Sequence, residues 1–82
     1  MGDRTLSVPD FIKLYRAHGC EADINRNSFV IVVWRQGAEY RRFSQHAHKG
    51  LRDKFGPFVV RRSRRHLGFD SMPDDRFYAP LD

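Results

Sequence analysis

The sequence of 82 residues contains one cysteine and no apolar run of membrane-spanning length. A single cysteine, Cys20, cannot form an internal disulfide, which excludes the small secreted domains held together by such bonds. Residues 1–4 contain no apolar core of a signal peptide, and no stretch approaches the ~18 apolar residues of a membrane span. The sequence therefore favours a soluble, cytoplasmic protein without a membrane partner, in which Cys20 is a small buried hydrophobe.

Acidic residues are nearly absent from residues 41–69 of the chain. Lys and Arg number 15 against 10 Asp and Glu, for a net charge of +5. Nine basic residues and one acidic residue give residues 41–69 a charge of +8, whereas residues 1–40 sum to zero and residues 70–82 to −3. A solubilising surface would mix both signs, so this block predicts binding to nucleic acid or to an acidic protein surface. We expect its basic residues to make the contact: Arg41, Arg42, Lys49, Arg52, Lys54, Arg61, Arg62, Arg64 and Arg65.

Apolar residues make up 40% of the chain, enough for one small core. We expect a single domain over residues 1–69, followed by an acidic, partly ordered tail over residues 70–82. The first predicted element is a helix with apolar residues at helical spacing. Ser7 is suited to cap it, Pro9 fits its first turn, and Gly19 provides a left-handed stop.

The pattern predicts three strands, separated by turns at Arg26–Asn27 and at residues 35–38: residues 20–25, residues 28–34 and residues 39–45. The first strand alternates polar and apolar residues, as a half-buried strand does. The second is β-branched and apolar throughout, which favours a central strand covered on both faces or nearly so. In the third, an exposed Tyr40 or Phe43 would offer a ring for base stacking. Four other aromatic residues are expected mostly in the core: Phe29, Trp34, Phe55 and Phe58.

Residues 46–56 are expected to form a loop, and Pro57 to begin a second helix that ends at Leu67 before Gly68. A strand over residues 58–60 is the alternative. In the helix, an inner face of Val59, Val60, Ser63 and Leu67 would leave four arginines mostly outside: Arg61, Arg62, Arg64 and Arg65. The predicted fold is α+β in the order α-β-β-β-α, with a three-stranded antiparallel sheet and two helices on one face.

This order resembles the HicA family of toxin–antitoxin mRNA interferases, whose fold is similar to the double-stranded-RNA-binding domain (dsRBD). The resemblance covers about residues 8–69 and rests on these motifs: Phe11-Ile12-x-Leu14 with His18-Gly19, the hairpin at Gly37, the loop His46-Ala47-His48-Lys49-Gly50, and Leu67-Gly68-Phe69. It implies a dsRBD-like fold. The family's catalytic histidine lies in a Gly-Ser-His motif, and the matching positions here read Asn27-Ser28-Phe29. A phenyl ring transfers no proton, so Phe29 removes the base that the resemblance would place there.

His46 and His48 are the remaining weak candidates for catalysis. Residues i and i+2 of a strand share a face, so two imidazoles there would suit the acid and the base of a metal-independent ribonuclease. Histidines in a basic loop also commonly contact phosphate or water without doing chemistry. No Cys/His spacing supplies the ligands that zinc requires, so we expect no metal and no cofactor.

The leading hypothesis is a small, non-catalytic binding module that engages nucleic acid, RNA or DNA, or the acidic surface of a nucleoprotein complex. Its size and charge fit an inhibitor from a phage or mobile element, for example of the anti-CRISPR type. One alternative is a HicA-like mRNA interferase toxin that uses His46 and His48. Another is a structural RNA-binding protein. The sequence does not indicate an oligomeric state.

Overall fold

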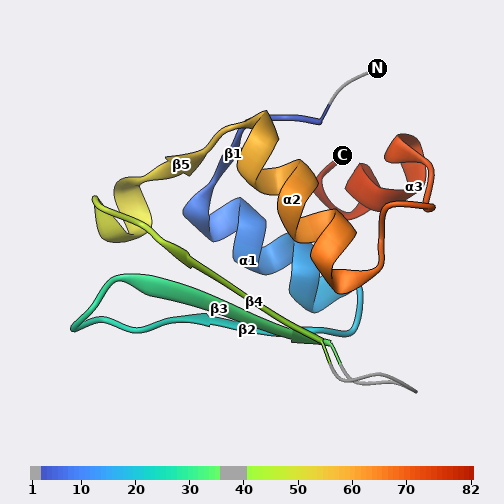
Figure 1. The fold of residues 1–82 in the computed structure, drawn as a ribbon. Coiled ribbons are helices and arrows are strands. Elements are labelled where there is room, and N and C mark those ends of the chain that lie inside the picture. Colours follow the sequence, from blue (N-terminus) through green and yellow to red (C-terminus); the bar gives the residue numbers. More distant parts are fainter. Residues whose placement is uncertain (1–2, 36–40) are drawn as a thin grey trace.

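A computed structural model describes residues 3–35 and 41–82. Its elements are, in chain order, β1 (Leu6–Ser7), α1 (Val8–Ala17), β2 (Glu21–Ile24), β3 (Val30–Arg35), β4 (Arg41–His46), the 3₁₀ helix η1 (Gly50–Arg52), β5 (Lys54–Phe55), α2 (Pro57–Leu67), α3 (Asp74–Tyr78) and the 3₁₀ helix η2 (Ala79–Leu81). Strands β2, β3 and β4 form an antiparallel sheet with β3 in the middle. The helices α1, α2 and α3 all lie on one side of this sheet (Figure 1). The predicted α+β class and three-stranded antiparallel sheet are therefore confirmed.

Helix α1 begins and ends as its sequence predicts. The Ser7 hydroxyl accepts a hydrogen bond from the backbone N–H of Asp10 at 3.3 Å, which satisfies one free donor of the first turn. The chain leaves the helix through Gly19, whose φ of +83° is the left-handed conformation that glycine adopts without strain. The apolar stripe of α1 includes Phe11 and Leu14, which are both fully buried in the core.

The turn between β2 and β3 is longer than the predicted Arg26–Asn27 pair. It extends from Asn25 to Phe29, because the Asn25 side-chain oxygen accepts the backbone N–H groups of Asn27 and Ser28. The backbone N–H of Phe29 then donates to the Asn25 carbonyl at 2.7 Å. This closure holds Phe29 at a φ of +56°, an uncommon conformation for a bulky residue.

Only one face of the central strand β3 is covered by the described residues. Ile31 and Val33 are fully buried beneath the helices. Val30, Val32 and Trp34 point to the other face and are half-buried. The expectation that β3 is covered on both faces is therefore wrong for the outer face.

Strand β4 places Phe43 opposite Val33 in the core. Phe43 is 6% exposed, so it offers no ring for base stacking. The other stacking candidate, Tyr40, lies outside the described residues, as does most of the predicted turn at residues 35–38 together with Gly37. The strand ends at His46, one residue later than predicted.

The predicted loop over residues 46–56 contains a 3₁₀ turn and a short strand. In β5, Phe55 pairs with Leu6 and Lys54 with Ser7 of β1, forming a two-stranded antiparallel sheet. Strands of two residues carry no periodic signal, which is why the sequence pattern gave no indication of them. The Asp53 carboxylate accepts the backbone N–H groups of Lys54 and Lys49, and the Lys54 bond in particular holds the pKa of Asp53 below its usual range.

Helix α2 runs over the predicted residues, and the strand alternative for residues 58–60 is wrong. Gly68 ends it with a φ of +84°. Ser63 is fully buried and its hydroxyl is paired twice, to the Val60 carbonyl at 2.6 Å and to the Tyr15 hydroxyl at 2.5 Å. These two bonds allow a polar side chain to join the contact between α1 and α2.

Residues 70–82 form α3 and η2, in place of the partly ordered tail that we expected. Phe77 is fully buried and Tyr78 is 1% exposed. The Phe77 ring stacks on the His18 ring at 5.1 Å between centroids, and the Phe77 carbonyl lies 2.7 Å from His18 Nε2. A five-residue helix is too short for a periodic pattern, so these aromatic residues were hard to assign to the core from the sequence.

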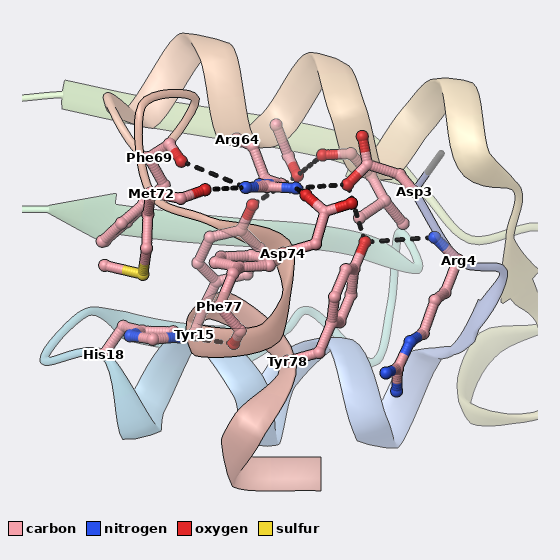
Figure 2. Close-up of polar contacts among 12 residues, drawn as sticks. Asp3, Arg4, Tyr15, His18, Arg64, Phe69, Met72, Asp74, Phe77 and Tyr78 are labelled. Atoms are coloured by element: carbon pink, nitrogen blue, oxygen red, sulfur yellow. Dashed lines mark hydrogen bonds and ion pairs between the residues drawn. The ribbon is translucent and has the colours of Figure 1, made fainter. Parts of the chain in front are cut away.

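The buried guanidinium of Arg64 joins α2 to both ends of the described chain (Figure 2). Arg64 is 5% exposed, which corrects the prediction that it lies outside with its three neighbours. Its Nη1 donates to Asp3 Oδ1 at 2.6 Å and to Asp74 Oδ1 at 2.8 Å. Its Nη2 donates to the carbonyls of Met72 at 2.6 Å and Phe69 at 3.4 Å. We call these five residues the Arg64 cluster.

The Arg64 cluster stabilises the charged forms of Arg64 and Asp74. Burial alone would lower the pKa of Arg64, but the hydrogen bonds to Asp74 and Asp3 outweigh it and raise the pKa. The Arg64 bond lowers the pKa of Asp74. The guanidinium also lies 4.3 Å from the centre of the Phe77 ring. Its Nε has no hydrogen-bond partner among the described residues, so the charge is held mainly through its two Nη groups.

We predict that Arg64→Met lowers the free energy of unfolding by about 3 kcal/mol, because it leaves two carboxylates without their cation. Urea denaturation followed by circular dichroism measures the change. Arg65→Met, on the exposed side of the same helix, is the matched control and should change stability by about 0.5 kcal/mol or less. Equal effects of the two substitutions would show that the Arg64 cluster does not hold the fold.

We also predict that stability falls as the pH rises from 10 to 12. Burial raises the pKa of Tyr78 from 10.0 to about 12, so the folded state keeps a proton that the unfolded state releases. The contribution of protonated Tyr78 to folding stability is fully present below pH 10 and is lost as the pH approaches 12. Tyr78→Phe, measured by denaturation at each pH, should show a shallower decline, although Tyr15, whose pKa is also raised, keeps part of the slope. A decline unchanged in Tyr78→Phe would contradict this assignment.

Candidate functional site

Four exposed side chains of α2 form one face of the helix: Phe58, Arg61, Arg62 and Arg65. The three arginines follow Phe58 by three, four and seven residues, so all four side chains share one side of the helix. The buried Val60 and Leu67 lie on the opposite side. They line a surface depression of about 440 Å³. We call these four residues the α2 outer face.

Phe58 is the residue of this face that sequence reasoning placed wrongly. Its side chain is 86% exposed, although we expected it mostly in the core. The signal was present in the helical spacing, because the turn that buries Val60 directs Phe58 to the opposite side. An aromatic side chain as exposed as that of Phe58 contributes nothing to the core. Large aromatic residues and arginine are both enriched in binding interfaces.

Two arginines of the α2 outer face repel each other along the helix. Arg61 and Arg65 are four residues apart, where like charges cost a few tenths of a kcal/mol. Neither has an ion pair with a carboxylate of the described residues. Arg62 donates from Nη2 to Gln45 Oε1 at 2.7 Å, which directs its guanidinium toward β4. A planar guanidinium pairs with phosphate and carboxylate groups alike, so the charge of this face is complementary to either anion.

The other predicted binding residues lie in separate places. Arg41 donates to the His66 carbonyl at 3.4 Å, near the end of α2. Arg42 points to the outer face of the sheet, where its guanidinium lies 5.5 Å from the centre of the Trp34 ring. Three more are exposed along the segment that leads to α2: Lys49, Arg52 and Lys54. Arg64 belongs to the buried cluster, so it is not part of an exposed basic surface.

His46 and His48 come together at one end of the sheet. Their ring centroids are 4.2 Å apart, edge to face, and both residues are exposed. Phe29 lies beside their loop: its carbonyl accepts the Ala47 N–H at 2.7 Å, and its ring packs against Gly50. The loop that carries the two imidazoles therefore adjoins Phe29. Within residues 3–35 and 41–82, no three His, Cys, Asp or Glu side chains are placed to hold a metal ion.

Comparison of the chain with protein-family models, with curated proteins and with solved structures gives no match. Among the helices of the described residues, none combines the length and the apolar character needed to cross a membrane. Functional assignment therefore depends on the side chains and their chemistry.

Proposed function

We propose that the protein is a small, non-catalytic module that binds nucleic acid through the α2 outer face. The observation that carries the proposal is an almost fully exposed phenyl ring, Phe58, among three arginines on one helix face. The α-β-β-β-α order of the main elements supports a dsRBD-like fold of the HicA type. Inhibition of a nucleic-acid-handling complex, as by an anti-CRISPR-type protein, is the biological role that this binding would serve.

Each part of the α2 outer face fits a separate part of a nucleotide. Guanidinium groups pair with phosphate oxygens, and this pairing is independent of base sequence. A phenyl ring stacks on an unpaired base, which contributes about 1–3 kcal/mol per base. Bases in a duplex are already stacked on each other, so Phe58 favours single strands or loops over duplexes. An acidic protein surface would satisfy the arginines but leave the ring without this partner.

Binding to labelled single strands and duplexes of RNA and DNA tests the proposal across a salt series. Replacing Arg61 and Arg65 with alanine should reduce the slope of log affinity against log salt by about 0.7 per lost phosphate contact on single strands. Phe58→Ala should weaken single-strand binding about tenfold, the equivalent of 1.4 kcal/mol, and leave the slope unchanged because the ring is uncharged. The loss on duplexes should be smaller.

Arg26→Ala is the matched control for charge, since Arg26 is exposed in the β2–β3 turn, away from α2. It should leave both affinity and slope close to those of the unaltered protein. Failure of every nucleic acid to bind at low salt would overturn the proposal and assign the α2 outer face to an acidic protein. Binding that survives the arginine and Phe58 substitutions would place the interface elsewhere on the molecule.

A second candidate function is supported by the contact between His46 and His48. One neutral and one protonated imidazole are the groups that deprotonate a ribose 2′-hydroxyl and protonate the leaving oxygen. If this pair is a ribonuclease centre, end-labelled RNA should be cleaved in the presence of a chelator. His46→Ala and His48→Ala should each abolish the cleavage, whereas Phe58→Ala should weaken RNA binding without abolishing the cleavage. Intact RNA after prolonged incubation would contradict this second function and leave the binding module.

A further inference from the structure

The outer face of the sheet is a second surface, separate from the α2 outer face. The helices lie on the opposite side of the sheet (Figure 1). Alternate positions of the three strands supply the side chains of this outer face. Strand β2 contributes two acidic residues, β3 three apolar ones, and β4 three basic or polar ones. In chain order they are Glu21, Asp23, Val30, Val32, Trp34, Arg42, Ser44 and His46. We call these eight residues the open sheet face.

The strand register gives the open sheet face an acidic edge on β2 and a basic or polar edge on β4. Trp34 pairs with Glu21 on one side and with Arg42 on the other. Val32 lies in the next row, between Asp23 and a serine of β4. The face is therefore acidic along β2, apolar along β3 and basic or polar along β4.

The apolar side chains along β3 distinguish the open sheet face from an ordinary solvated surface. Single exposed apolar residues are common on proteins, but Val30, Val32 and Trp34 are consecutive outward positions of one strand. A strand that is apolar on both sides is typical of a sheet covered on both faces. The acidic edge at Glu21 and Asp23 would repel phosphate groups, so nucleic acid is a poor occupant. The face instead suits a surface with an apolar middle and the reverse order of charge.

We propose that the open sheet face binds the same face of a second copy of this chain. A two-fold axis parallel to the strands places β2 of one copy over β4 of the other, and β3 over β3. Glu21 then lies opposite Arg42 of the partner subunit, and Trp34 packs at the axis. A two-fold axis across the strands would instead set β2 over β2, acid against acid. The two sheets would pack as an aligned sandwich about 10 Å apart, and the interface is self-complementary as a symmetric dimer requires.

The size of the face indicates a concentration-dependent dimer. Strands about 4.8 Å apart with residues about 3.3 Å apart give a patch on the order of 20 Å by 15 Å. This area, on the order of 300 Å², is well below the roughly 800 Å² per partner that stable interfaces bury, so the dimer is expected to be weak. Asp23 also lies 4.0 Å from Arg16 of α1, an exposed ion pair that competes for its charge. Glu21 has no such pair with a described residue, so it is the better position for a test.

Sedimentation at micromolar to millimolar concentrations, without nucleic acid, tests the dimer. The unaltered chain should associate as its concentration rises, and Glu21→Lys and Arg42→Glu should each shift it to monomer. An equimolar mixture of these two variants should dimerise again, because each then meets an opposite charge at both symmetric contacts. Asp10→Lys, an exposed change on α1, should leave association unaltered. Circular dichroism confirms that every variant is folded.

A chain that stays monomeric at millimolar concentration would overturn the proposed dimer. So would single variants that associate as the unaltered chain does, or a mixture that fails to restore the dimer. Association in all variants would mean that another surface is used. None of these outcomes depends on nucleic acid, so the dimer and the proposed function fail or succeed separately.

Discussion

The burial of one positive charge on α2 constrains more of this fold than any other single interaction. Arg64 is held by Asp3 near the start of the chain and by Asp74 near its end. A buried charge without its partners costs several kcal/mol, so both terminal segments must be in place whenever α2 is packed on the core. The negative charge of residues 70–82, which looks in the sequence like a solvated tail, supplies one of the two carboxylates. Folding of the two ends of the chain is thereby coupled to the position of α2.

The same constraint fixes which side of α2 meets solvent. Arg64 and Ser63 are both polar, yet each is buried with its hydrogen-bond partners, so the inner face of the helix is specified by polar pairing as well as by Val60 and Leu67. The rotation of the helix leaves Phe58 exposed beside Arg61 and Arg65, which have no ion pair with a described carboxylate. Rigid presentation matters for binding, because an interface that is already ordered loses less conformational entropy when a partner arrives.

The sequence predicted the elements whose signals are local and periodic. Helix α1, the three main strands and the bounds of α2 follow from apolar spacing, from Ser7 and from the two glycines that stop the helices. The burial of Arg64 could not be predicted in this way, since it reads as one of four equivalent arginines and its carboxylate partners lie 61 and 10 residues away. The strands β1 and β5 were too short to leave a pattern. For Phe58, the helical spacing by itself indicated an exposed side chain. The residue was nevertheless expected in the core, because a small domain tends to bury its aromatic residues.

The two exposed surfaces differ in charge, and therefore in the partner that we propose for each. The α2 outer face is positive throughout and carries one ring, which suits a chain of phosphates with an accessible base. The open sheet face balances acid against base around an apolar row, which suits its own copy and repels phosphate at one edge. Since the helices and the open sheet face lie on opposite sides of the sheet, association through one would leave the other free (Figure 1). A dimer would then present two α2 outer faces, and binding of both to one strand would raise affinity without a new contact.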